Sequence, residues 1–210
     1  MKTIKYISVR AALVAVACLL GIASGKAQLI PNGYLNVDWQ YNVPWNDDFA
    51  EKSSGWGMNF EGGYYVLPEL AVGAFISYHT NNKYVPRQTL PNGNQSTMTT
   101  DQQHSIFQLP FGVVGRYRFL QNSMFEPYAA LKLGPNYAKM SSYYYVLETY
   151  EKTWGFYFSP EIGVTFFPVE GYRLGIHLSL YYSYATNKGH VLHYSVDGLG
   201  NFGFRVGLSF

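Results

Sequence analysis

Ten ionisable residues recur along the chain between apolar neighbours, and together they could form a buried network of charges. They are the acids Asp38, Glu61, Glu126 and Glu161, the bases Arg116, Arg118, Lys132, Arg173 and Arg205, and His177. Acids and bases in nearly equal number can neutralise one another, whereas unpaired buried charges are costly. The set therefore predicts paired charges that plug the interior of the protein. The alternative is that the same residues form a gated ion path or a proton relay.

The remaining histidines could suggest a metal site. His190 and His193 are spaced as H-x2-H with Asp197 nearby, and His79 and His104 flank another polar segment. A metal site needs further ligands on a rigid backbone, and the sequence indicates neither. We therefore expect solvated loop histidines, with no metal and no cofactor.

The elements that would position the charges are β-strands, and residues 201–210 show their pattern most clearly. Polar or small residues, Arg205 among them, alternate there with five apolar ones. The apolar members are Phe202, Phe204, Val206, Leu208 and Phe210. A strand of a closed membrane barrel has this pattern, because its outer face meets hydrocarbon and its inner face meets a polar lumen.

Seven further segments repeat the alternation. Together they predict eight strands at residues 35–43, 56–66, 70–79, 107–119, 126–137, 154–166, 173–184 and 201–210. No stretch after residue 27 approaches a transmembrane helix, and open sheet edges are not tolerated in lipid. We predict an all-β fold, an eight-stranded antiparallel up-and-down transmembrane β-barrel whose last strand pairs with its first. The lumen of such a barrel is just wide enough for side chains to fill, which favours the plug.

Two charge pairings follow from this arrangement. Pairing Phe119 with Phe125 across a short turn would place Arg118 opposite Glu126. Counted from the short turns, Lys132 and Glu161 would reach similar heights on adjacent strands. Pro160, in the middle of the sixth predicted strand, agrees less well with a closed barrel, because such a barrel has no free edge for a residue without an N–H. Pro160 therefore predicts a bulge, or else an error in the assigned strand.

The connections between the predicted strands alternate between short and long. The long ones cover residues 44–54, 80–105, 140–152 and 185–200. Bacterial barrels combine tight periplasmic turns with longer extracellular loops, so both termini should be periplasmic. Segment 80–105 is rich in Asn, Gln and Thr, as a flexible exposed loop would be. The Tyr-rich segment 141–147 could extend its strands as a ribbon suited to a partner protein, or could only enlarge the outer aromatic girdle.

Lipid-facing aromatic residues provide a test of orientation, since they should gather at the two membrane interfaces. Trp56, Tyr137 and Trp154 fall at the predicted outer rim, and Tyr64 and Phe119 at the periplasmic rim. Aromatics make up 18% of the chain and charged residues only 13%. Soluble domains average about 25% charged residues, so the composition also favours a membrane protein.

The first 27 residues have the character of a secretory signal peptide. A basic start is followed by an uncharged run, residues 11–23, and by small residues before a cut after Ala27. We expect residues 1–27 to be cleaved, leaving a barrel domain at 28–210. Lipoprotein cleavage at Cys18 is the alternative, but the usual Leu three residues earlier is absent. Without the signal, 11 basic and 13 acidic residues remain, so the basic pI indicates no nucleic-acid binding.

On these features the chain resembles the small eight-stranded outer-membrane barrels, the OmpA/OmpX-like porin family. The resemblance implies the outer membrane of a Gram-negative bacterium, with outer-membrane lipid and lipopolysaccharide as contacts. It also implies that the outer-membrane insertion machinery reads a carboxy-terminal signal: Phe202, Phe204, Val206, Leu208 and Phe210. We expect no peptidoglycan-binding domain after Phe210.

Three functions remain compatible with such a barrel. We expect a non-enzymatic surface or structural protein that acts through its extracellular loops on a protein or surface ligand. The first alternative is a narrow channel or transporter for small solutes. The second is a lipid A-modifying enzyme, since His193-Tyr194-Ser195 is similar to the H-x-S of an outer-membrane lipid A deacylase. The residues after Ser195 depart from that family, so we do not expect enzymatic activity.

Overall fold

Eight antiparallel strands make up the fold of the computed structural model. It describes residues 32–45, 49–92, 96–121, 123–144, 147–168, 174–191 and 194–210, so the predicted signal peptide, Arg173 and His193 lie outside the described residues. No helix in the described part is long and apolar enough to cross a membrane. The strands are β1 Gly33–Trp45, β2 Gly57–Tyr65, β3 Leu70–Asn92, β4 Ser96–Arg118, β5 Phe125–Tyr144, β6 Leu147–Phe166, β7 Gly175–Val191 and β8 Tyr194–Ser209.

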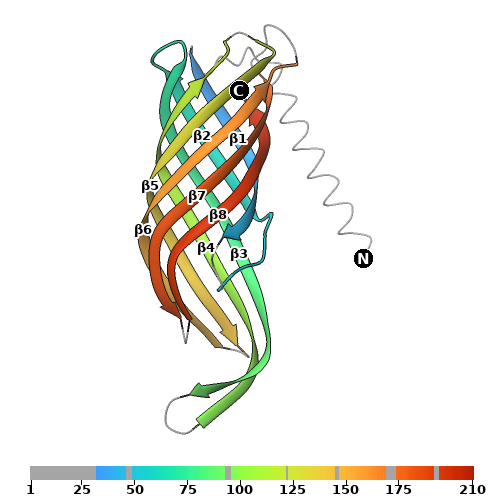
Figure 1. Cartoon of the computed structure of the whole chain (residues 1–210), viewed down its shortest axis with the longest axis vertical. Helices are drawn as coiled ribbons and strands as arrows, with labels where there is room; N and C mark the ends of the chain where they lie inside the picture. Colours follow the sequence, from blue (N-terminus) through green and yellow to red (C-terminus); the bar gives the residue numbers. More distant parts are fainter. Residues whose placement is uncertain are drawn as a thin grey trace, which may run out of the picture.

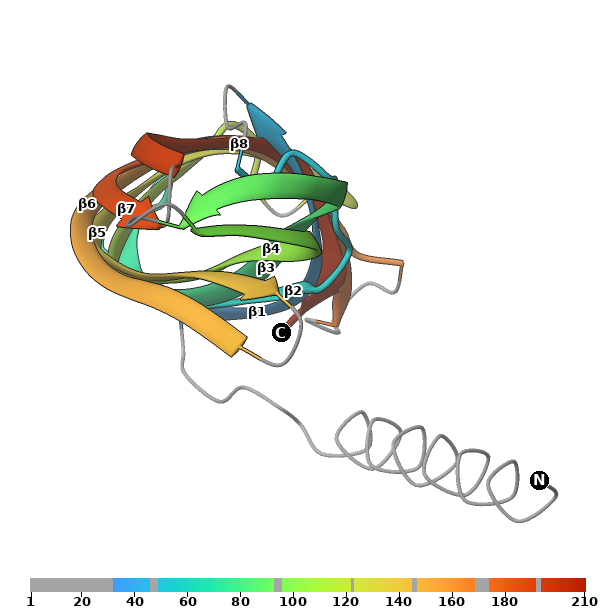
Figure 2. The same ribbon diagram turned by 90° about the horizontal axis from the view of Figure 1, so that it is seen from below.

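The strands close into a barrel in which each pairs with its neighbour in the sequence and β8 pairs with β1 (Figures 1 and 2). The closing seam runs from Asn36 opposite Ser209 to Trp45 opposite Gly200. Just beyond it, Leu35 and Phe210 exchange two backbone hydrogen bonds of 3.0 and 2.8 Å. The predicted up-and-down barrel is confirmed, and its two described ends lie at the end of the barrel that carries the short turns (Figure 1).

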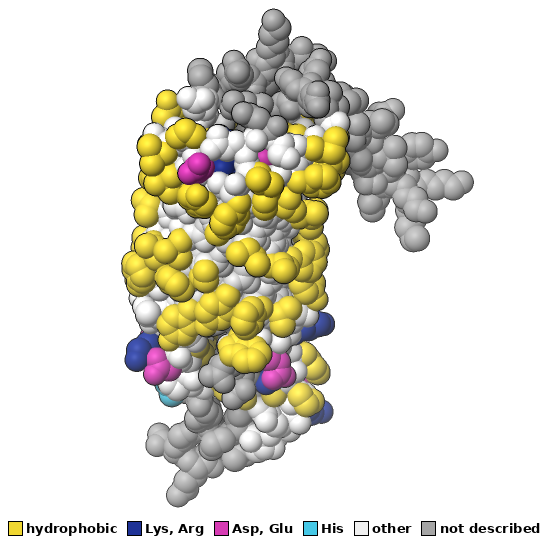
Figure 3. All heavy atoms as spheres, turned by 45° about the horizontal axis from the view of Figure 1, so that its top comes forward, with side chains coloured by type: hydrophobic (Ala, Val, Ile, Leu, Met, Phe, Trp, Pro, Cys, Tyr) yellow, Lys and Arg dark blue, Asp and Glu magenta, His cyan; other side chains and the backbone are white. Residues whose placement is uncertain are grey.

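Alternation of side chains along each strand gives the barrel an apolar outside and a polar inside. In β1, Asn36, Asp38 and Gln40 are completely buried, whereas Trp39 on the opposite face is 45% exposed. Apolar side chains form a band across the face of the molecule seen in Figure 3, and charged side chains lie at the edges of that band. This distribution is the one that a lipid-facing wall requires.

The strands are longer than predicted on the side away from the chain ends. β3 and β4 have 23 residues each and remain paired out to Asn92 opposite Ser96, so the expectation of a flexible loop at 80–105 is wrong. The hairpin projects beyond the rest of the barrel (Figure 1), and a register shift between Val85 and Gln88 interrupts its ladder. Its polar composition conceals a strand because both faces of a ribbon outside the membrane can be polar.

The other long connections also differ from the prediction. The Tyr-rich segment is confirmed as a ribbon, because β5 and β6 stay paired as far as Tyr144 opposite Leu147. β7 and β8 likewise remain paired as far as Val191 opposite Tyr194, with a register shift between Ala185 and Lys188. Three of the four predicted long loops are thus largely hairpin.

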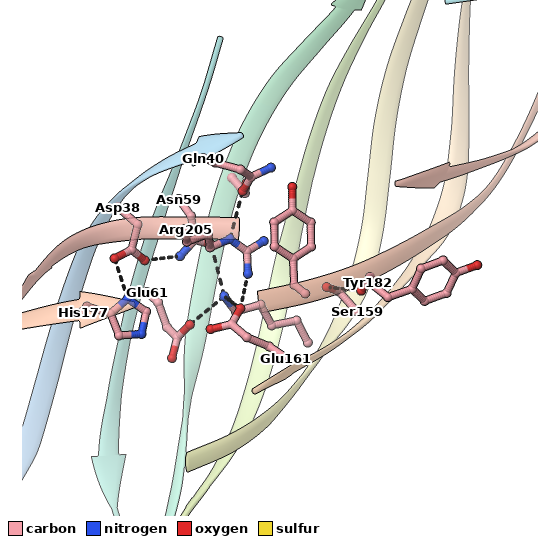
Figure 4. Close-up of polar contacts among 12 residues, drawn as sticks. Asp38, Gln40, Asn59, Glu61, Ser159, Glu161, His177, Tyr182 and Arg205 are labelled. Atoms are coloured by element: carbon pink, nitrogen blue, oxygen red, sulfur yellow. Dashed lines mark hydrogen bonds and ion pairs between the residues drawn. The ribbon is translucent and has the colours of Figure 1, made fainter. Parts of the chain in front are cut away.

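Pro160 causes neither a bulge nor a break in its strand. β6 is continuous through it, Pro160 lies opposite Leu131 of β5, and the register with β7 is the same on both sides of it. That register places Pro160 opposite Tyr182, whose carbonyl instead accepts a hydrogen bond of 2.8 Å from the Ser159 hydroxyl (Figure 4). A side chain next to the proline therefore supplies the donor that its backbone lacks.

Candidate functional site

The middle of the lumen holds a row of ion pairs that crosses the barrel. Lys132 of β5 places its ammonium 2.7 Å from Glu61 Oε2 of β2 and 2.9 Å from Glu161 Oε2 of β6. Arg205 of β8 binds the same oxygen of Glu161 from the other side (Figure 4). All four side chains are fully shielded from solvent. Because β2 and β5 are not neighbours, this row fills the lumen rather than lining it.

A chain of hydrogen bonds runs beside the ion pairs. Asp38 Oδ1 lies 2.6 Å from His177 Nδ1, and His177 Nε2 lies 2.5 Å from the Tyr128 hydroxyl. That hydroxyl also lies 2.5 Å from Glu161 Oε1, and Asn59 donates to Asp38 at 2.9 Å. The geometry would suit a short proton relay. Both of its ends, however, are buried carboxylates, Asp38 and Glu161.

The charges nearer the short turns are stacked against aromatic rings. Arg116 has its guanidinium carbon 3.7 Å from the centre of the Tyr128 ring and 4.6 Å from that of Tyr34, and it donates to Thr165 Oγ1 at 2.9 Å. Glu61 Oε1 lies 3.9 Å from Nη1 of Arg116. A cation held between two rings is stabilised where water is excluded.

Arg118 and Glu126 form another pair, nearer the short-turn end. Their charged atoms lie 3.6 Å apart, and both side chains retain some exposure. The predicted pairing of Phe119 with Phe125 is wrong by two residues, because Arg118 lies opposite Tyr128. A shift of two keeps every side chain on its face of the strand, so Arg118 and Glu126 still meet.

Sequence reasoning missed a set of large aromatic residues inside the lumen. They are Tyr34, Phe75, Tyr128 and Tyr181, all nearly or fully buried. Arg205 stacks on one of them, with its guanidinium carbon 4.0 Å from the centre of the Tyr181 ring. Their inward direction could have been predicted, since each occupies an inward-facing position in the alternation of its strand. It was overlooked because aromatic residues in a membrane barrel usually suggest contact with lipid.

Residues 49 and 50, in the connection from β1 to β2, are buried at the mouth between the long hairpins. Phe49 is only 2% exposed, stacks on His104 at 4.3 Å and meets the edge of Tyr194 at 5.8 Å. Phe49 belongs to a cluster of buried apolar side chains whose other members include residues of the hairpins: Ile106, Met140, Val191, Val196 and Leu199. The lumen is therefore capped by an apolar cluster above its charged layers.

Two of the predicted loop histidines belong to this interior, so the expectation that they are solvated is wrong. His79 is fully buried, with Nδ1 3.3 Å from the Gln40 amide, and His104 Nδ1 lies 3.1 Å from the Phe49 carbonyl. Burial lowers the pKa of His104, the hydrogen bond to Phe49 opposes that shift, and nearby Lys83 adds to it. Only His190 of the four is both described and exposed. The described residues contain no group of three metal-binding side chains.

The predicted insertion signal lies on the outer wall of β8. Phe202, Phe204 and Val206 are each more than a third exposed, and Leu208 and Phe210 are partly exposed. Rings of β1 pack against them, since Phe202 meets Trp45 at 5.4 Å and Phe204 stacks on Tyr41 at 5.4 Å. Their recognition by the insertion machinery stays a prediction.

A family model matches the sequence, and a search of solved structures finds similar folds. The model of the outer membrane protein beta-barrel domain matches residues 11–210. Neisserial surface protein A has a similar structure, with a TM-score of 0.54 and 15% identity over 85% of this chain and 96% of that one. Ail of Yersinia pestis has a TM-score of 0.47 and 14% identity over 85% of this chain and 97% of that one. OprG of Pseudomonas aeruginosa has a TM-score of 0.44 and 13% identity over 84% of this chain and 93% of that one. No curated protein matches the chain.

At these identities the structural likenesses concern the fold alone. The family match, by contrast, covers nearly the whole sequence, including all eight strands of the closed ring. The chain belongs to the outer membrane protein β-barrel domain family.

Proposed function

We propose that this protein is a non-enzymatic surface barrel that holds its long hairpins outside the outer membrane and does not conduct solutes. The observation that carries the proposal is the filled lumen, in which Lys132 lies between Glu61 and Glu161 across the barrel. An eight-stranded lumen has room for side chains and little more. Beyond it, the apolar cluster that includes Phe49 occupies the mouth.

The hairpins supply the surface through which such a protein would act. Tyr84, Tyr143 and Tyr150 are 61%, 43% and 52% exposed on the ribbons beyond the barrel wall. Tyrosine offers a large contact area and a hydrogen bond at a low cost in conformational entropy. A protein or another surface ligand is the kind of partner that these ribbons suit.

Conduction distinguishes this proposal from the narrow channel. The purified barrel in a planar bilayer should give no current steps, and a Glu161→Gln variant should be equally silent because the aromatic side chains still fill the lumen. Reproducible single-channel steps from the unmodified protein would overturn the proposal and favour a channel.

Labelling of intact cells tests the orientation, with both termini in the periplasm. Cys18 is the only cysteine of the whole chain and falls within the predicted signal, so single cysteines can be placed freely. Tyr84→Cys and Tyr150→Cys should react with a membrane-impermeant maleimide on whole cells. Ser123→Cys, at a short turn, should react only after the outer membrane is permeabilised. The reverse pattern would place the hairpins in the periplasm.

Action through the hairpins needs its own test. Joining Val85 to Gln102 by a two-residue turn removes the projection of β3 and β4 and keeps their inner register, in which these residues are opposite. Cells that carry this variant should lose autoaggregation and adhesion to polystyrene relative to cells with the intact barrel at the same surface level. Unchanged adhesion and aggregation would count against the projecting hairpin as the acting surface.

A further inference from the structure

A pair of lysines faces outward on the β5–β6 hairpin, directly beyond the aromatic residues of the barrel rim. Tyr137 lies opposite Trp154, and the next outward-facing pair is Lys139 opposite Lys152. The Tyr137 and Trp154 rings are 5.3 Å apart, and Trp154 is 64% exposed. Exposed Trp and Tyr sit at the level of lipid headgroups. Two residues along a strand add about 7 Å, so the lysines stand at the outer edge of that level.

Two like charges directly opposite each other destabilise a pair of strands. This one is only half compensated, because Lys139 binds Glu148 at 2.7 Å whereas Lys152 has no ion pair among the described residues. Both ammonium groups lie against the Tyr150 ring, 4.6 and 5.4 Å from its centre. By contrast, Lys188 and Asp197 on the β7–β8 hairpin pair one to one at 2.9 Å. An excess of positive charge therefore remains on this wall of β5 and β6.

We propose that Lys139 and Lys152 bind the phosphate group of a membrane lipid at the outer surface of the barrel wall. A phosphate monoester carries nearly two negative charges and would relieve the repulsion between the lysines. The site rests on the membership of the barrel in the outer-membrane family and does not depend on the hairpin role proposed above.

The surroundings favour a lipid phosphate over free phosphate. Phe107 of β4 lies opposite Lys139 on the same outward wall, and Trp154 and Tyr137 lie one step toward the membrane. These rings offer apolar area to the body of a lipid, and inorganic phosphate has nothing to place there. Glu148 competes with the ligand, because its carboxylate already accepts a hydrogen bond of 2.7 Å from the Lys139 ammonium.

Lipid titration with charge-matched variants tests the site. The full barrel is placed in phosphatidylcholine nanodiscs with increasing phosphatidic acid, a phosphomonoester lipid, and bound lipid is counted by native mass spectrometry. Each of Lys139→Gln and Lys152→Gln should weaken retention of phosphatidic acid about fivefold, the effect typical of one lysine at an anionic surface. Glu148→Gln should strengthen it. Lys188→Gln and Asp197→Asn, which make the same charge changes on the neighbouring hairpin, should have no effect.

The outcomes separate the possible sources of binding. Equal changes in lipid retention from the β5–β6 and β7–β8 variants would show that net charge alone causes the effect, and would overturn the proposal. Unchanged retention in every variant would overturn it as well. Inorganic phosphate that displaces phosphatidic acid at equal concentration would show that the rings contribute nothing, and would overturn the lipid assignment. Heat-modifiable gel migration verifies that each variant is folded. Because Lys152 forms no ion pair with any residue that the structure describes, its variant remains informative if that of Lys139 fails to fold.

Discussion

The hydroxyl of Ser159 donates a hydrogen bond of 2.8 Å to the carbonyl of Tyr182, beside the residue of β6 that has no N–H. The register on either side places Pro160 opposite Tyr182, so this carbonyl would otherwise lose its partner in the barrel wall. Inside a bilayer there is no water to replace that partner. A serine before the proline thus allows a proline in the middle of a closed sheet.

Ser159→Ala should therefore lower the free energy of unfolding by about 1–3 kcal/mol, the cost of a buried carbonyl without a donor. Adding Pro160→Ala should restore much of the loss, because the backbone N–H returns. Urea unfolding of the barrel in lipid vesicles measures both. Ser183→Ala, at a buried serine of β7 whose hydroxyl bonds to no described residue, serves as the control. A serine effect that persists in the Pro160→Ala background would contradict this account.

Lys132→Met should be one of the most damaging single substitutions. It leaves Glu61 and Glu161 close together without the cation between them, and breaking a buried ion pair costs about 3–5 kcal/mol. Lys188→Met removes an exposed pair, whose two side chains are 72% and 73% exposed, and should cost at most about 1 kcal/mol. Unfolding in vesicles compares them. Adding Glu61→Gln to the Lys132→Met protein should recover part of the free energy of unfolding. If it does not, the loss of stability is not caused by the uncompensated carboxylates.

Phe210 should contribute in two separable ways. Deleting it removes both backbone hydrogen bonds to Leu35, whereas Phe210→Ala keeps them and removes only the ring. Refolding into vesicles should be slowed by the deletion and little changed by the alanine. In cells, where the insertion machinery acts, both should reduce the amount of barrel in the outer membrane. Normal insertion of Phe210→Ala would show that the aromatic ring is no signal.

Acid should loosen the cap over the mouth. When the cap opens, His104 has the ordinary histidine pKa near 6.5, and burial under Phe49 lowers it. The closed form therefore has its full stability above about pH 6.5 and loses it as the pH falls toward the lower pKa. Hydrogen exchange of residues 49–56 at pH 7.5 and 5.5 measures the opening. His104→Gln should abolish the difference, and a difference that survives in this variant would assign the titration elsewhere.

The sequence predicted the ring of strands because alternation with period two is imposed by lipid on one side and a polar lumen on the other. It failed where that constraint ends. In β3 and β4 beyond Tyr84 and Gln103 no hydrocarbon demands an apolar face, so Asn, Gln and Thr look like a loop although they form a ladder. The same segment was expected to place His104 in solvent.

The candidate site was predictable as a set of residues but not as a set of contacts. Facing direction follows from parity along each strand, which is why Glu61, Lys132 and Glu161 could be grouped. Which charges touch depends on the tilt and stagger of the closed ring, and a register error of two residues preserves parity while moving a side chain by about 7 Å. The inward fold of Phe49 has no periodic signal at all, because it lies in an irregular connection.

The seam between β1 and β8 also has a kinetic meaning. It joins residues such as Gln40 and Arg205, which are 165 positions apart, by a direct hydrogen bond. Contacts between such distant residues slow folding, because the entropy of closing the chain is lost before the contacts form. Until β8 arrives, β1 and β7 both have open edges that could pair with other chains. A chain with only seven strands formed would therefore be prone to aggregation, and we expect the barrel to need a holding partner in water until the ring closes in the membrane.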